Sequence, residues 1–188
     1  MDVGELLVDG FGRVRDGVHA VLDGLGEEQL AWRPAPGANS IGWLVWHLTR
    51  VQDDHVAHVA GRQQAYTEGG WHQRLGLPFP APDIGFGHSS EDVAGVSGVA
   101  GGELAAYLGM VHERTVTFVR GLAPADLDRV VDTCWDPPVT LGVRLVSVLE
   151  DDLQHLGQAA YVRGLLRPGA GGAAATVDPV TPTPPPLP

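Results

Sequence analysis

The chain has 188 residues and a net charge of −11, which is unfavourable for a phosphate-binding surface and argues against a nucleic-acid partner. It has no lysine, which excludes Schiff-base chemistry and a P-loop, and its single cysteine, Cys134, excludes a disulfide framework. No signal peptide and no apolar run of about 20 residues is evident, so we expect a cytoplasmic domain without membrane contact.

The N-terminal part of the chain predicts two helices with a loop between them. Apolar residues recur at helical spacing from about residue 3 to 25. Residues 30–39 contain the proline and glycine of a loop. Ser40 is a suitable N-cap for a second helix over 41–60, and Gly61 is a typical stop signal.

The middle of the chain begins with a long stretch, residues 62–89, that is rich in glycine, proline and aromatic residues. A connection of this length is usually functional or at least a packed lid. Ser89 or Ser90 is a suitable cap for a short helix over 91–96. The apolar spacing then predicts a longer helix over 103–120.

The C-terminal part predicts a single helical turn over 124–128, a loop over 133–138 and a last long helix capped by Thr140. Residues 168–188 are rich in glycine, alanine, proline and threonine, as is typical of an extended or disordered tail. We therefore predict one all-α domain over 1–167, a four-helix bundle with a long crossover loop.

Three residues of this bundle suit a divalent metal ion. Residues 148–166 predict an amphipathic helix that places Asp151 and His155, four positions apart, on one face, while Asp152 is a weaker candidate. His47 falls in the apolar stripe of the second helix. Two histidines and a carboxylate leave coordination positions open, as in catalytic metal sites. Zinc is the default, and nickel, iron or manganese would accept the same ligands.

The pattern also permits a simpler interpretation, in which His47 and His155 are core histidines that hydrogen bond to polar neighbours. Arg50 and Arg163 could bind an anion, although solvation or pairing with carboxylates is the favoured alternative. Cys134 is expected to be an inert structural thiol. The remaining histidines are expected on the surface or in loops: His19, His55, His58, His72, His88 and His112.

Two segments carry a family resemblance. Residues 40–48, Ser-Ile-Gly-Trp-Leu-Val-Trp-His-Leu, and residues 151–165, which begin Asp-Asp-Leu-Gln-His-Leu-Gly-Gln, resemble the DinB/YfiT-like metalloproteins, in particular the mycothiol-dependent branch. The resemblance covers about residues 3–166. It implies a four-helix bundle, a homodimer and a divalent metal held by three histidines, one on the second helix and two as His-x-x-x-His on the fourth.

Carried over, this resemblance gives His47, Asp151 and His155 as the metal ligands, with Asp151 in place of the middle histidine. That exchange lowers the charge of the complex by one and makes the metal a weaker Lewis acid. The resemblance implies that the metal activates a low-molecular-weight thiol, such as mycothiol, for attack on a small electrophile. The leading hypothesis is thus a thiol S-transferase. The alternatives are a non-catalytic metal-binding bundle that acts through dimerisation and a metal-independent protein that binds a small ligand.

Overall fold

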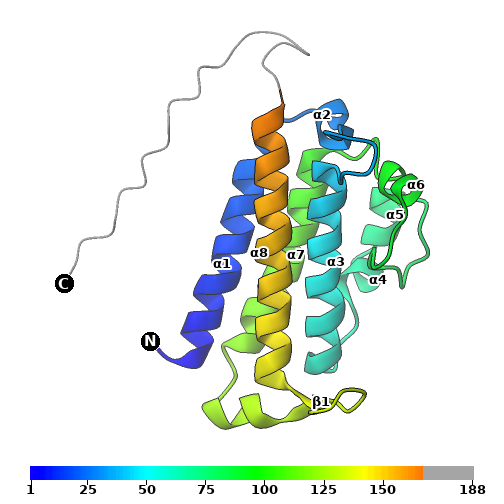
Figure 1. The fold of residues 1–188 in the computed structure, drawn as a ribbon. Coiled ribbons are helices and arrows are strands. Elements are labelled where there is room, and N and C mark those ends of the chain that lie inside the picture. The colour runs from blue at the N-terminus through cyan, green and yellow to red at the C-terminus, as the bar shows by residue number, and fades with distance from the viewer. Residues whose placement is uncertain (167–188) are drawn as a thin grey trace, which may run out of the picture.

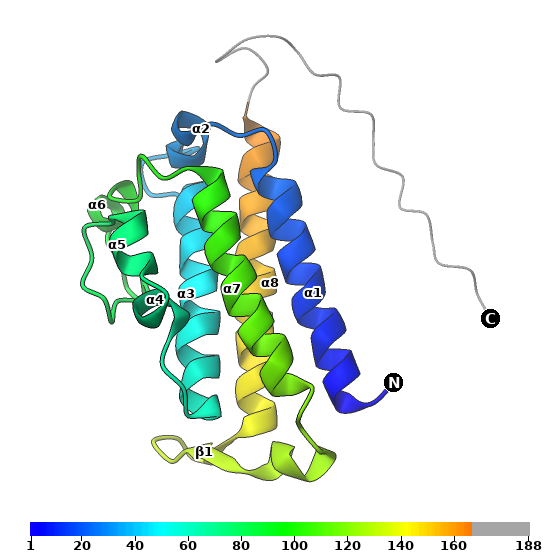
Figure 2. The same ribbon diagram turned by 180° about the vertical axis from the view of Figure 1, so that it is seen from behind.

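The computed structural model describes residues 1–166, and four long helices of this range pack side by side as a bundle (Figures 1 and 2). The four are α1 (Val3–Leu22), α3 (Ile41–Ala60), α7 (Gly101–Val119) and α8 (Leu141–Leu165). The predicted all-α four-helix bundle is confirmed. The predicted tail over 168–188 lies outside the described residues.

The ends of the long helices follow from local capping. Asp2 and Glu5 form a capping box at the start of α1, in which each carboxylate accepts from the other residue's backbone N–H. Ser40 and Thr140 cap α3 and α8 through hydrogen bonds from the backbone N–H three residues on. Gly61 ends α3 in the left-handed conformation, with φ of 64°. The predicted limits of α3 are therefore confirmed.

The bundle core is made by apolar faces of all four helices. α3 packs on α7 and α8, and α1 packs on the same two helices from the opposite side. α1 approaches α8 closely because Gly17 leaves room for Leu156, whose Cδ2 would lie 2.6 Å from an added Cβ. Burial of a large apolar side chain such as Trp46 or Phe11 stabilises the fold by roughly 1.5–3 kcal/mol. None of the helices within residues 1–166 has the length and apolar character needed to cross a membrane.

The long connection between α3 and α7 packs against the outside of these two helices (Figure 2). It contains three short helices: α4 (Ala65–Glu68), α5 (Trp71–Leu75) and α6 (Ser90–Ala94). Trp71, Leu75, Leu77 and Phe79 are buried, so the prediction that this connection is packed is confirmed. Of these helices only α6, capped by Ser89, follows the prediction. α4, α5 and the preceding α2 (Glu27–Ala31) are too short for a helical period to show in the sequence.

One end of the bundle is covered by the segment that joins α7 to α8. It contains the predicted helical turn, a 3₁₀ helix η1 (Pro124–Asp128). A two-stranded antiparallel hairpin follows, with β1 (Val130–Asp132) and β2 (Val139–Thr140). Only a loop is predicted from the sequence within this hairpin, because strands of two and three residues carry no recognisable alternation.

Candidate metal centre

The structure brings together the three residues that the sequence analysis selected. α3 contributes His47, and the neighbouring α8 contributes Asp151 and His155. One potential ligand atom from each side chain lies within 4.8 Å of the others. His47 is buried, whereas the side chains of His155 and Asp151 are 17% and 33% exposed. The group could therefore hold a metal ion that is reached from solvent on the α8 side.

The ring of His47 is oriented by the crossover segment, the name we use for residues 62–89. Its Nδ1 lies 2.5 Å from the carbonyl oxygen of Ile84. Because a carbonyl only accepts, Nδ1 is the protonated nitrogen and the lone pair is left on Nε2. Burial lowers the pKa of His47, an effect that the hydrogen bond to Ile84 opposes. The imidazole is thus held neutral and in one tautomer, which is the arrangement that metal-binding histidines need.

Two buried atoms of the group have no hydrogen-bond partner within the described chain. They are Oδ2 of Asp151 and Nδ1 of His155. The two side chains also face each other across 3.6 Å, which is too long for a hydrogen bond between His155 Nε2 and Asp151 Oδ1. An unsatisfied buried polar group costs about 1–3 kcal/mol. A divalent cation on this group would offset that cost, so the residues present fit a metal.

Trp43 forms a wall beside both histidines. Its ring stacks on His47 with 4.6 Å between centroids and meets His155 edge-on at 6.3 Å. Its Nε1 donates to Nδ1 of His88 at 3.0 Å, and Nε2 of His88 lies 3.1 Å from the Asp83 carboxylate. His88 lies in a loop, as predicted, but its side chain is not on the surface, because the crossover segment folds back and leaves it only 7% exposed.

Arg50, one turn after His47 on α3, is also fully buried. Its guanidinium donates to the carbonyl oxygens of Asp83 at 3.0 Å and Ala81 at 3.3 Å. It also lies over the ring of Tyr66, 4.1 Å from the centroid. The predicted alternatives for Arg50 included pairing with a carboxylate, which holds for the buried Asp53, whereas the predicted solvation of its side chain is wrong. Arg50 also fixes the backbone next to Ile84, which in turn orients His47.

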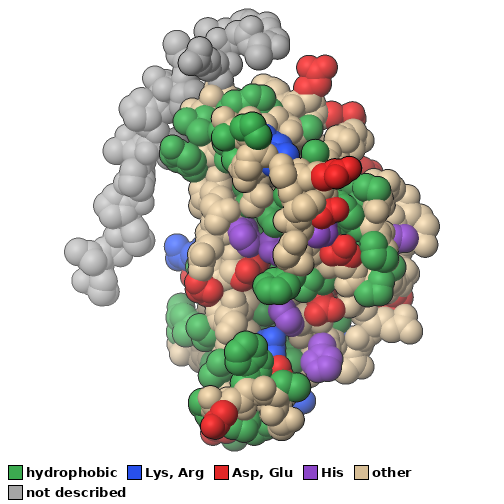
Figure 3. All heavy atoms as spheres, turned by 45° about the vertical axis from the view of Figure 1, so that its right-hand side comes forward, with side chains coloured by type: hydrophobic (Ala, Val, Ile, Leu, Met, Phe, Trp, Pro, Cys, Tyr) green, Lys and Arg blue, Asp and Glu red, His purple; other side chains and the backbone are tan. Residues whose placement is uncertain are grey.

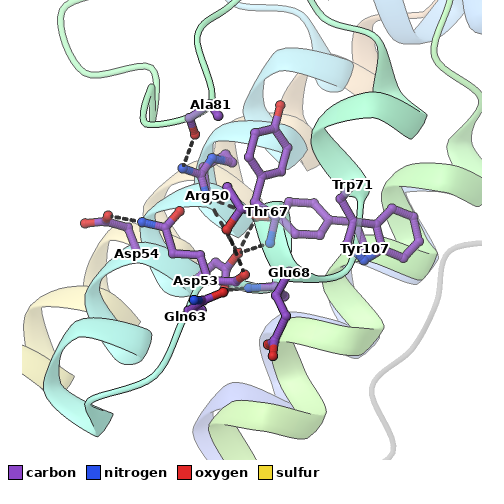
Figure 4. Close-up of polar contacts among 12 residues, drawn as sticks. Arg50, Asp53, Asp54, Gln63, Thr67, Glu68, Trp71, Ala81 and Tyr107 are labelled. Atoms are coloured by element: carbon purple, nitrogen blue, oxygen red, sulfur yellow. Dashed lines mark hydrogen bonds and ion pairs between the residues drawn. The ribbon is translucent and has the colours of Figure 1, made fainter.

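Asp53 completes this buried network (Figure 4). Its carboxylate accepts from the backbone N–H groups of Ala65 and Tyr66 at 2.8 Å and from the Tyr107 hydroxyl at 2.9 Å. It lies 3.6 Å from the Arg50 guanidinium. Burial raises the pKa of Asp53, and these three hydrogen bonds and Arg50 act in the opposite direction. The network therefore ties the crossover segment to α3.

Asp152, the weaker candidate ligand, does not belong to the three-residue group. Its side chain is fully buried, and neither oxygen has a hydrogen-bond partner within residues 1–166. Burial raises the pKa of this carboxyl well above its usual range, and the neighbouring charge of Asp151 raises it further. Asp152 is thus a buried acid of the core beside the candidate site.

The other predicted polar residues have different surroundings. Figure 3 shows several histidine side chains on one face of the molecule, with acidic side chains among them. His112 is buried and lies 3.2 Å from the Arg15 guanidinium, so its predicted surface position is wrong. Arg163 binds backbone carbonyls at the end of α1, including that of Asp23 at 2.8 Å. Cys134 is exposed.

Most of the residues around the candidate ligands are not predictable from the sequence. Trp43 had a usable signal, because it precedes His47 by four residues and therefore lies on the same face of α3. Ile84 acts through its backbone carbonyl, and any residue type could supply that atom. Asp83 and His88 lie in the crossover segment, where no periodicity indicates their position.

Comparisons with known proteins agree with this architecture. The family model described as the DinB superfamily matches residues 11–159. A crystal structure described as that of a conserved protein from Enterococcus faecalis is similar, with a TM-score of 0.83 and 28% sequence identity over 88% of this chain and 98% of the other. No protein of curated function matches the chain.

Proposed function

The chain belongs to the DinB superfamily, and on that premise we propose that it is a divalent-metal-dependent thiol S-transferase. The observation that carries the proposal is the convergence of His47, Asp151 and His155, whose potential ligand atoms lie within 4.8 Å of one another. Three protein ligands leave positions open for a substrate. The ligand set favours zinc and would also accept nickel, iron or manganese.

A divalent ion in this position would hold a low-molecular-weight thiol, for which mycothiol is the leading candidate, as its thiolate at neutral pH. His47 contributes a neutral nitrogen in a tautomer fixed by Ile84. Asp151 contributes a negative charge that partly neutralises the cation. In the overall transfer, the sulfur forms a bond to the electrophilic carbon, the leaving group departs with the bonding pair and the thiol proton passes to solvent.

The exposed side of the group suits entry of both substrates. His155 and Asp151 retain solvent contact, whereas His47 is shielded by Trp43 and the crossover segment. The thiol and the electrophile would therefore approach from the α8 side. The aspartate makes the site less electrophilic than one with three histidines, so a reactive electrophile is the expected partner.

The first test is the metal content of the purified protein, measured by elemental analysis beside His155→Ala and Asp151→Ala. We expect about one divalent ion per chain, as in other three-ligand sites, and its loss in both variants. If the metal is lost in His155→Ala but retained in Asp151→Ala, Asp151 is not a ligand and water takes its place. A native protein that stays free of metal after supplementation would overturn the proposal.

The second test is thiol-dependent conversion of a chlorodinitrobenzene-type electrophile by the metal-loaded protein. Conversion that requires both the thiol and an intact His155 supports the transferase. A metal-loaded protein that converts no electrophile with any thiol would instead be the non-catalytic metal-binding bundle. The homodimer stays a prediction, and sedimentation of the purified protein would test it.

A further inference from the structure

A cavity of about 320 Å³ is lined in part by residues one helical turn from His47 and His155, and it has no part in the reaction proposed above. Its volume falls within the range of small-molecule sites. It opens between the loop that precedes α3 and the C-terminal half of α8, at the end of the bundle where α2 lies in Figure 1. Its lining includes Gly37, Ala38, Asn39, Leu44, Gln158 and Tyr161, and we call it the carboxamide cavity.

The carboxamide cavity lies about one helical turn from the candidate metal ligands, along the seam between α3 and α8. On α3, Leu44 precedes His47 by three residues, and on α8, Gln158 follows His155 by three. The two helices run antiparallel, since the early Arg144 of α8 meets the late His55 of α3. The path from His47 to Leu44 and the path from His155 to Gln158 therefore lead toward the same end of the bundle. Each covers about 4.5 Å along the helix axis, at 1.5 Å per residue. A molecule whose sulfur sits at the group could extend into this cavity.

The side chains of the cavity are suited to an uncharged polar group. The carboxamides of Asn39 and Gln158 each offer two donors and an acceptor. Tyr161 adds an aromatic ring and a hydroxyl. It is 69% exposed, so its side chain is not part of the packing of the bundle core. No charged residue is among the described residues that line the cavity, and a charged ligand would find no counter-ion there.

We propose that the carboxamide cavity is the recognition subsite for the part of the thiol substrate that carries hydroxyl or amide groups and no charge. This inference rests on the proposed thiol-dependent function. It assigns the choice among thiols to Asn39, Gln158 and Tyr161, whereas the metal ligands bind the sulfur that every thiol shares.

The test uses the full-length protein loaded with Co²⁺, whose visible absorption reports a bound thiolate. The probes are 1-thio-β-D-glucose, which carries a hydroxyl-rich uncharged group, and 2-mercaptoethanol, which lacks a comparable one. We expect the thiosugar to bind about tenfold more tightly, the effect of one or two added hydrogen bonds. Gln158→Ala and Tyr161→Ala should remove most of this preference while the affinity for 2-mercaptoethanol and the cobalt content stay unchanged.

Gln154→Ala is the matched control, because Gln154 lies one turn before Gln158 on α8 and hydrogen bonds to Glu150 outside the cavity lining. This variant should retain the preference. Three results would overturn the subsite and leave the metal–thiol chemistry standing. They are equal affinities for the two probes, a preference for the thiosugar that is unchanged in Gln158→Ala and Tyr161→Ala, and tighter binding of the charged glutathione. No spectral change with any thiol would overturn the proposed function, and this inference with it.

Discussion

Arg50 and Asp53, three residues apart on α3 and 3.6 Å from each other, hold opposite ends of the same crossover segment. Asp53 binds the backbone N–H groups of Ala65 and Tyr66 near its start. Arg50 binds the carbonyl of Asp83 near its end, directly before the residue that orients His47. One buried ion pair thus anchors a segment of the chain at both ends and supports the geometry of a candidate metal ligand.

Replacement of Arg50 by methionine should therefore be strongly destabilising. It leaves the Asp53 carboxylate buried without its cation, and removal of one partner of a buried pair costs about 3–5 kcal/mol. Urea unfolding of the metal-free protein measures the loss. The double variant Arg50→Met with Asp53→Asn should lose less than the sum of the two single variants, because no lone charge remains. Additive losses would show that the two side chains act independently.

Gly85→Ala should weaken metal binding more than it weakens the fold. Gly85 has φ of 89°, and an added Cβ would lie 2.8 Å from Nδ1 of His47 and 2.9 Å from the ring of Trp46. The His47 ring must then move, and disturbance of the groups behind a ligand typically lowers metal affinity about 10–100-fold. Competition with a chromophoric chelator measures the affinity.

Gly87→Ala is the control for this prediction. Gly87 has φ of 76°, but an added Cβ would meet no atom within 4 Å. Both alanine variants carry a similar backbone strain of about 1–2 kcal/mol. Gly85→Ala adds the contacts with His47 and Trp46, so Gly87→Ala should lose less stability and keep the native metal affinity. Equal metal affinities in the two variants would show that the contact with His47 does not matter.

Asp151→His should retain the metal and strengthen thiol binding. The substitution replaces an anionic ligand by a neutral one, which raises the charge of the complex by one and favours an added thiolate. Titration of the Co²⁺-loaded protein with 2-mercaptoethanol should show about tenfold tighter binding than in the native protein, the equivalent of about 1.4 kcal/mol. Asp151→Ala is the control and should lose the ion. Weaker thiol binding in Asp151→His would argue against a charge effect of Asp151.

Asp152→Asn should stabilise the metal-free protein at neutral pH. Burial raises the pKa of Asp152 well above its usual range, so the folded state holds a proton that the unfolded state releases above about pH 3.9. The native protein consequently loses stability as the pH rises from this value towards the folded-state pKa. Asparagine cannot ionise, so the variant should be more stable than the native protein at pH 7.

The pH profile distinguishes this effect from a change in packing. The difference between Asp152→Asn and the native protein should shrink as the pH falls to about 4, where the unfolded carboxyl also becomes protonated. Denaturant unfolding of both proteins across this range provides the measurement. A variant that is less stable than the native protein at every pH would show that the carboxylate is stabilised by a group not identified as its partner.

The sequence predicted the long helices and the shared face of two candidate ligands because both depend on local rules. Ser40 and Gly61 mark the ends of α3 through capping chemistry, and the four-residue spacing of Asp151 and His155 places them on one helical face. The pairing of these residues with His47 rested on its place in the apolar stripe of the second helix and on the family resemblance, since spacing within a helix says nothing about contacts between helices.

What the sequence did not reveal depends on tertiary contacts of the crossover segment. Arg50 is charged, and its burial follows only from the carbonyls of residues 81 and 83, which lie more than 30 positions along the chain. The same holds for His88, which is buried by the rings of Trp46 and Phe79. A long segment without periodicity gives no indication of which of its atoms return to the bundle.

The division of the candidate ligands between α3 and α8 has a consequence for the lifetime of the protein in a cell. These helices are remote in sequence, so the unfolded chain does not preserve the arrangement of His47 and His155. An ion bound only by the folded state adds about 4.1 kcal/mol of stability when its free concentration is about 1,000 times its Kd. Scarcity of the ion would then raise the unfolded fraction that proteases degrade, and the abundance of the protein would follow the metal supply.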